Sequence, residues 1–238
     1  MTPTERLFTH PEPHQAEYAA LAAFRDSTGL FVDVGANIGQ SIASLRLYAK
    51  AMRAVCFEPL PALEPAMQEL LRLKQIDAYH KVALGREPST LSLVVPTVGD
   101  VPLTSRATLY AAKFGGEPYR ESLRAVARRP GAMVSLETVE VPCATLDSFD
   151  LAPAVLKLDV EGHELAVLEG AARTVQRHRP CILLEPSRDR PALQARMASL
   201  GYRIHRWAEG ALRPWDGGPA DNVWCEPEGA RFLDGFKR

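Results

Sequence analysis

The chain has 238 residues, 46% of them apolar, which is enough for the core of one large α/β domain. Its formal net charge of −1 gives no bulk electrostatic reason to expect nucleic acid or an acidic membrane as a partner. The first residues are polar and no long uncharged apolar run occurs, so we expect no secretion signal, no membrane span and a cytoplasmic protein.

Strand-like and helix-like segments alternate along most of the chain. Residues 1–29 are polar with a weak helical pattern at 18–24, and we expect them to form an N-terminal cap over one edge of a sheet. Short apolar or alternating runs predict strands, and apolar residues spaced by three or four predict helices. The expected strands are 30–34, 54–58, 79–84, 90–95, 138–145, 154–159, 181–185, 202–207 and 222–225. The expected helices are 37–49, 63–71, 165–175 and 191–200.

This alternation indicates an α/β fold with a mostly parallel sheet and helices on both faces. The last two strands are joined by a short connection, so they can pair antiparallel as a hairpin. Residues 96–137 break the pattern with many Gly, Pro and Arg residues, and we interpret them as a lid insertion within a domain at 30–238. The four cysteines are far apart in strand-like segments and are expected to be core thiols in a reducing compartment: Cys56, Cys143, Cys181 and Cys225.

The loop after the first strand is the first candidate ligand site, because ligands bind beyond the carboxyl ends of parallel strands. Gly35 and Gly39 should leave the backbone open to a ligand. Asn37 should cap the next helix, whose first N–H groups favour a carboxylate of the ligand. Asp33 should lie near an ammonium group or an ordered water. The spacing Asp-x-Gly-x-Asn-x-Gly differs from that of nicotinamide-binding turns and favours S-adenosylmethionine (SAM) over NAD. The cofactor-binding candidates here are Asp33, Gly35, Ala36, Asn37 and Gly39.

Two later positions extend this candidate cofactor site. Glu58 ends the second strand, where a carboxylate can accept hydrogen bonds from both ribose hydroxyls, although this feature would also suit NAD. Ala83 opens the segment after the third strand, which by its position should lie near an adenine.

A second polar cluster follows the strand 154–159. Three carboxylates and an imidazole within six residues repel one another unless they face a cation, which can be the sulfonium of SAM, a metal ion or Lys157. Asp159 and His163 are candidates for the base or the acceptor anchor. Asp159, Glu161 and Glu185 could also bind Mg²⁺, and Glu164 is interpreted as a helix N-terminal acid. The catalytic candidates are Asp159, Glu161, His163 and Glu185, and Asp159 is also a cofactor-binding candidate.

The lid holds two further groups of polar residues. Arg120, Arg124 and Arg128 would form one basic stripe on a helix, either a solvated face or a grip on a phosphate or carboxylate. The residues 104–106 and Thr108 could hydrogen-bond polar groups of a substrate.

Three segments resemble, in order and spacing, the FkbM family of SAM-dependent methyltransferases. They are Asp33–Gly39, Thr145–Asp147 and Lys157–Glu164 with its continuation to Ala171, and the family's other acids appear as Glu58 and Glu185. The resemblance covers roughly residues 30–225. It implies a Rossmann-like class I methyltransferase fold with a seven-stranded sheet and a reversed last strand. It also implies O-methylation of a sugar, polyketide or other small secondary metabolite, with S-adenosylhomocysteine as the product.

Two other functions stay open at this point. An NAD-dependent oxidoreductase of the same fold class would share Glu58, but the loop spacing and the lack of a Ser-Tyr-Lys pattern disfavour it. A non-catalytic module that binds SAM or a nucleotide would keep the cofactor site without turnover. The expected partner is a small hydroxyl-bearing molecule, with no nucleic acid and no membrane, and a homo-oligomer is an open expectation.

Overall fold

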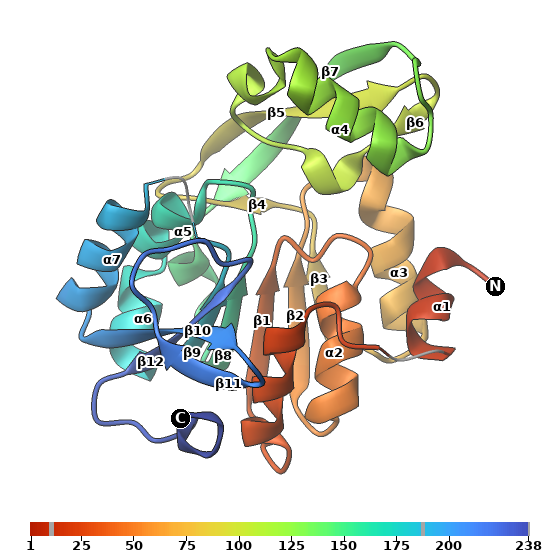
Figure 1. The fold of residues 1–238 in the computed structure, drawn as a ribbon. Helices are drawn as coiled ribbons and strands as arrows, with labels where there is room; N and C mark the ends of the chain where they lie inside the picture. The colour runs from red at the N-terminus through yellow and green to blue at the C-terminus, as the bar shows by residue number, and fades with distance from the viewer. Residues whose placement is uncertain (10–11, 187–188, 238) are drawn as a thin grey trace.

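A twisted eight-stranded sheet forms the body of the protein (Figure 1). The computed structural model describes residues 1–9, 12–186 and 189–237. In spatial order the strands are β11 (Ala211–Pro214), β10 (Tyr202–Ala208), β12 (Val223–Pro227), β9 (Cys181–Leu184), β8 (Pro153–Leu158), β1 (Leu30–Val34), β2 (Arg53–Phe57) and β3 (Ala78–His80). Strands β9, β8, β1, β2 and β3 run parallel, so their carboxyl ends share one edge.

The reversed strand β12 lies between β9 and β10 and is antiparallel to both. The expected antiparallel pairing of the last two strands is therefore confirmed, but they do not form the expected hairpin. The expected number of seven strands is wrong, because the connection between them contains β11. Glu209 and Gly210, both with positive φ, make a two-residue turn that pairs β11 with β10.

Helices cover both faces of this sheet, as expected. On one face α2 (Gln40–Tyr48), α3 (Glu64–Arg72) and the 3₁₀-helix η1 (Ala16–Phe24) pack over a core that includes Phe31 and Trp224. On the other face α5 (Glu164–Gly170), α6 (Ala172–His178) and α7 (Arg190–Ser199) pack over Val32 and its neighbours. Shorter elements complete the body: α1 (Pro3–Thr9), η2 (Pro61–Leu63), η5 (Leu146–Phe149) and η6 (Asp234–Phe236).

Several boundaries differ from the sequence expectation. The N-terminal segment does not line a sheet edge, because Tyr18 and Leu21 are buried in the core of one face. The helix expected at 37–49 begins only at Gln40, after left-handed Asn37 and Gly39. The helix expected at 165–175 divides into α5 and α6. The strand expected at 79–84 also divides, and its second part joins another sheet.

That second sheet is small and carries the expected insertion. Its order is β4 (Ala83–Leu84), β7 (Val134–Ala144), β5 (Ser89–Val98) and β6 (Val101–Pro102). The long antiparallel pair β5–β7 rises above the carboxyl ends of β1 and β2, and α4 (Glu117–Ala127) packs on it (Figure 1). Two 3₁₀-helices, η3 (Thr104–Arg106) and η4 (Ala111–Phe114), precede α4. Residues 96–137 thus contain their own apolar cluster, around Val98, Phe114 and Leu123.

All four cysteines are buried and free, which confirms the expectation of core thiols. Within the described ranges, no helix has the length and apolar character needed to cross a membrane.

Candidate functional site

A cavity of about 480 Å³ opens at the carboxyl edge of the large sheet, and residues of the small sheet form part of its wall. Loops after β1, β2 and β8 reach it together, as the parallel topology requires. All but two of the predicted site residues line it: Gly35, Ala36, Asn37, Glu58, Ala83, Asp159, Glu161, His163 and Glu185. Asp33 and Gly39 lie behind this wall.

The packing of the protein itself requires the two glycines of the β1 loop. Gly35 has φ +78°, and a Cβ there would lie 1.9 Å from the carbonyl oxygen of Asp159. Gly39 has φ +99°, and its Cβ would lie 2.8 Å from a methyl carbon of Leu70. A larger residue at Gly35 would displace the backbone that follows β8, and one at Gly39 would strain a left-handed backbone and displace the Leu70 side chain.

The predicted helix cap at Asn37 is also wrong. Gly39, which has no side chain to offer, occupies the cap position of α2. Asn37 instead has φ +51°, and its backbone N–H donates to Glu58 Oε2 at 3.0 Å. The β1 loop is therefore held by the carboxylate at the end of β2.

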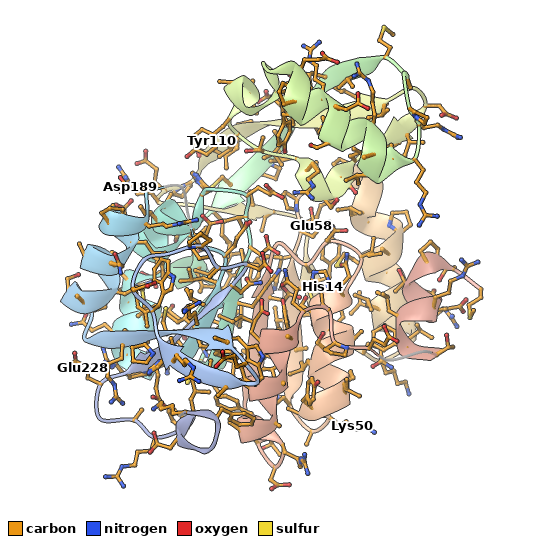
Figure 2. The ribbon with its side chains drawn as sticks, viewed as in Figure 1. His14, Lys50, Glu58, Tyr110, Asp189 and Glu228 are labelled. Atoms are coloured by element: carbon orange, nitrogen blue, oxygen red, sulfur yellow. The ribbon has the colours of Figure 1, made fainter. Side chains whose placement is uncertain are left out.

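Glu58 is a buried carboxylate facing the cavity, with only 5% of its surface exposed (Figure 2). Its Oε1 accepts the N–H of Leu60 at 3.1 Å, so each oxygen accepts one backbone hydrogen bond. Each oxygen keeps a further lone pair for another donor. Burial raises the pKa of Glu58 to about 7, although the N–H groups of Leu60 and Asn37 pull it down.

Asp33 holds a lysine rather than facing the cavity. Its carboxylate is fully buried, and its Oδ1 lies 3.0 Å from Lys157 Nζ, while Ser41 Oγ donates to Oδ2. Lys157 also donates to the carbonyl oxygen of Gly35 at 2.7 Å, and its Nζ lies 3.7 Å from Asp159 Oδ2. Burial would lower the pKa of Lys157, but the charges of Asp33 and Asp159 outweigh it and hold the pKa well above its ordinary value. The two motifs are thus joined by a buried ion pair.

The turn after β8 is tied to the insertion. Glu161 and Gly162 both have positive φ, of +54° and +105°. Thr108, which is buried, donates through Oγ1 to the carbonyl oxygen of Glu161 at 3.1 Å. Tyr110 donates through its hydroxyl to the carbonyl oxygen of Gly162 at 3.3 Å. The insertion therefore fixes the backbone from which the Glu161 side chain reaches the cavity.

Glu164 and His163 have separate roles in the same turn. Glu164 is fully buried, and its Oε1 accepts the N–H groups of Val160 and Gly162 at 3.2 and 3.0 Å, in keeping with the expected helix N-terminal acid. His163 lies against the chain after β4, since a Cβ on Gly85 would be 3.1 Å from its Nε2. Burial, with the charge of Arg86, lowers the pKa of His163. His163 thus lies on the side of the cavity where adenine was expected.

The Mg²⁺ hypothesis is not supported. In the described part of the chain, no three His, Cys, Asp or Glu residues come together as metal ligands. Asp159, Glu161 and Glu185 line the same cavity without forming such a cluster.

The basic stripe of the insertion lies away from the cavity. Arg124 pairs with Glu121 at 2.9 Å and donates to the carbonyl oxygen of Ala132 at 2.8 Å, which ties α4 to the residues just before β7. Arg120 donates to the carbonyl oxygen of Phe114 at 3.1 Å. These contacts favour a structural role for the stripe over a substrate grip. The neighbouring residues Thr104, Ser105 and Arg106 do line the cavity.

Two further groups of cavity residues were not predicted from the sequence. His14, Gln15 and Tyr18 come from the N-terminal segment, and Asp221 and Asn222 come from the residues just before β12. No motif marks the first group. The second group could have been found, because the start of a reversed strand lies at the edge where its parallel neighbours end.

Comparison with known proteins agrees with this geometry. The methyltransferase FkbM domain model matches residues 33–204. No curated relative matches the sequence.

Among solved structures, the methyltransferase FkbM from Methylobacillus flagellatus KT is 19% identical, with a TM-score of 0.54 over 94% of this chain. The match covers 50% of that protein, so this chain spans about half its length. A SAM-dependent O-methyltransferase from Thermotoga maritima is 10% identical, with a TM-score of 0.44 over 97% of this chain and 73% of its own. A precorrin-6y C5,15-methyltransferase from Geobacter metallireducens is 10% identical, with a TM-score of 0.42 over 90% of this chain and 88% of its own. The family match covers well over half of the sequence, and the chain belongs to the methyltransferase FkbM family.

Proposed function

We propose that this protein is a SAM-dependent O-methyltransferase that methylates a hydroxyl group of a sugar, a polyketide or another small secondary metabolite. Family membership supports methyl transfer with SAM. The observation that carries the proposal is the convergence of Glu58 and Asp159 on one cavity, from the ends of β2 and β8.

The residues present fit the cofactor. A vicinal diol can donate to the two free lone pairs of the Glu58 carboxylate, one hydroxyl to each oxygen. Carboxylates of Asp159, Glu161 and Glu185 line the same cavity and favour a cationic sulfonium there. SAM, when bound, supplies the methyl group on that sulfonium.

The chain's own part in the reaction is to position the acceptor and to take its proton. In-line displacement depends mainly on alignment, which the braced β1 loop and the β8 turn provide by fixing the cavity wall. Asp159 Oδ1 is the proposed site for the proton that the acceptor hydroxyl loses, because this side chain is about one-third exposed and ends a central strand. Glu161 and Glu185 are proposed to anchor the acceptor's other polar groups.

The small sheet and the insertion together support a small acceptor of mixed polarity. Leu91, Leu93 and Leu109 present apolar surface to the cavity, and Thr104 and Ser105 bring hydroxyl groups to it. A sugar ring or a polyketide has both kinds of surface. Residues 96–137 resemble the family pattern least, so we expect this insertion to determine the specificity for the methyl acceptor.

Two measurements test the proposal. Isothermal titration should show S-adenosylhomocysteine binding at micromolar concentrations, and a screen of hydroxylated acceptors by intact mass should show products that gain one CH₂ unit. The variant Asp159→Asn should lose turnover by at least about a hundredfold, while its affinity for S-adenosylhomocysteine should fall far less. Binding of NADH in place of S-adenosylhomocysteine would refute the proposal, and binding without turnover of any acceptor would indicate a non-catalytic module.

A further inference from the structure

Asn222 is a buried amide at the cavity wall that the proposed reaction does not yet use. It precedes β12, whose first residue Val223 pairs with Leu184 at the end of β9. Because β12 runs opposite to its parallel neighbour, its start lies at the same edge as the cofactor loop. Asn222 is 5% exposed and lines the cavity together with Gln15.

The two polar atoms of this side chain are treated differently. Asn222 Nδ2 donates to Glu17 Oε1 at 2.8 Å and to Gln15 Oε1. Both partners are acceptors, which fixes the orientation of the amide. Asn222 Oδ1 is buried and has no hydrogen-bond partner within the described ranges. A buried acceptor without a donor costs free energy unless a ligand satisfies it.

The N-terminal segment holds this acceptor in place. Trp224 donates through Nε1 to the carbonyl oxygen of Glu17 at 2.9 Å, and the N–H of His14 donates to Ser44 Oγ on α2 at 2.8 Å. The segment therefore joins β12 to the helix that follows the β1 loop. These contacts link the two ends of the chain at the cavity wall.

The order of the strands gives the direction of a bound cofactor. With the adenosine held by Glu58 and Ala83, as proposed above, it would lie on the β2 and β4 side of the cavity, and its amino-acid arm would extend toward β8, β9 and β12. That arm carries a carboxylate, which needs donors, and an ammonium group, which needs acceptors. Asn222 Oδ1 offers only an acceptor, and Asp159 and Asp221 add negative charge to the same wall.

We propose that Asn222 is a cofactor-binding residue whose Oδ1 accepts a hydrogen bond from the ammonium group of the methyl donor, with residues 14–17 fixing its position. This inference rests on the proposed function and adds a residue to its cofactor site. An acceptor hydroxyl is the alternative donor to Oδ1, and the experiment separates the two.

The experiment compares two ligands on two proteins by isothermal titration. The ligands are S-adenosylhomocysteine and its deaminated analogue, which lacks only the amino group. The wild type should bind S-adenosylhomocysteine about ten- to a hundredfold more tightly than the analogue, the range for a hydrogen bond to a charged group. In Asn222→Ala that preference should shrink by about tenfold, because only the amine-bearing ligand loses a contact, while the charges of Asp159 and Asp221 remain.

Ser44→Ala is the matched control. It removes the acceptor for the His14 N–H and loosens the same segment, but it leaves Asn222 Oδ1 intact. It should therefore keep the wild-type preference for the amine. Asn222→Ser replaces Asn222→Ala if thermal melting shows that the alanine variant is unfolded.

The outcomes are distinct. An unchanged preference for the amine in the Asn222 variants would overturn the assignment and would point to the acceptor or to a purely structural tie. Loss of the preference in Ser44→Ala as well would also overturn it, because docking of the segment would then be the cause. A wild type that bound neither ligand would refute the proposed function itself, and this assignment with it.

Discussion

Cofactor affinity should depend on pH through Glu58. This carboxylate has a pKa of about 7 in the unliganded protein, because burial raises it. We expect the ribose hydroxyls to bind the charged form, since charged acceptors make the stronger hydrogen bonds. Affinity for S-adenosylhomocysteine should therefore be full above pH 7 and should fall as the pH drops through 7 and the carboxylate takes up a proton.

The magnitude follows from the charged fraction of Glu58. With a pKa of about 7, roughly nine in ten carboxylates are charged at pH 8 and roughly one in ten at pH 6. An apparent dissociation constant scales inversely with the binding-competent fraction, so it should rise about tenfold between pH 8 and pH 6. Binding at pH 7 should also release about half a proton per ligand, because the bound state keeps the charged form.

Isothermal titration at the two pH values measures the affinity, and titration in buffers of different ionisation enthalpy measures the proton release. Glu58→Gln is the control, because it cannot titrate and offers one oxygen to the N–H groups of Asn37 and Leu60. It should bind at least about tenfold more weakly at pH 8. A wild type and a Glu58→Gln variant with the same pH dependence would refute this reasoning and would assign the titration to other groups.

Three further changes test the framework of the site. Lys157→Met leaves the Asp33 carboxylate buried without its cation, so urea denaturation should show a loss of about 3–5 kcal/mol in the free energy of unfolding. A loss under about 1 kcal/mol would contradict a stabilising role for the buried ion pair of Lys157 and Asp33. Thr108→Val removes the hydrogen bond to the Glu161 carbonyl, so kcat should fall severalfold while the Kd for S-adenosylhomocysteine stays constant; a parallel change in both would place Thr108 in the cofactor site. Arg124→Gln should lower the melting temperature without changing the acceptor KM, because its contacts lie within the insertion; a raised KM would restore the idea of a basic substrate grip.

The architecture of the large sheet could be predicted from the sequence wherever a strand is fully buried. The run Leu30–Val34 and the segment around Leu156 are apolar except for Asp33 and Lys157, and both are central strands. The strand β11 was missed because four residues between turns give too short a pattern. The break between β3 and β4 was missed because both parts are apolar, and only tertiary pairing assigns them to different sheets.

The candidate site was predictable where one loop carries its own signal. Glu58 and Asp159 each end a buried strand, so topology alone brought them to the cavity. The burial of Asp33 against Lys157 could not be foreseen, because an acid at a strand end looks the same whether it faces a ligand or a lysine. No local motif marks Asn222, and only the reversed direction of the last strand could have placed it at the carboxyl edge of the sheet.

The contact between the segments Asp33–Gly39 and Lys157–Glu164 also limits which substitutions each of them can accept. Gly35 lies against the carbonyl group of Asp159. Lys157, at the end of β8, pairs with Asp33 and donates to the carbonyl oxygen of Gly35. Neither segment can therefore change independently of the other. A bulkier residue at Gly35 requires a displaced backbone at Asp159, and a neutral residue at position 33 leaves the charged Lys157 without its main partner. We expect the two stretches to be inherited as a matched pair. Chimeras that take both from one relative should fold, and chimeras that divide them between distant relatives should not.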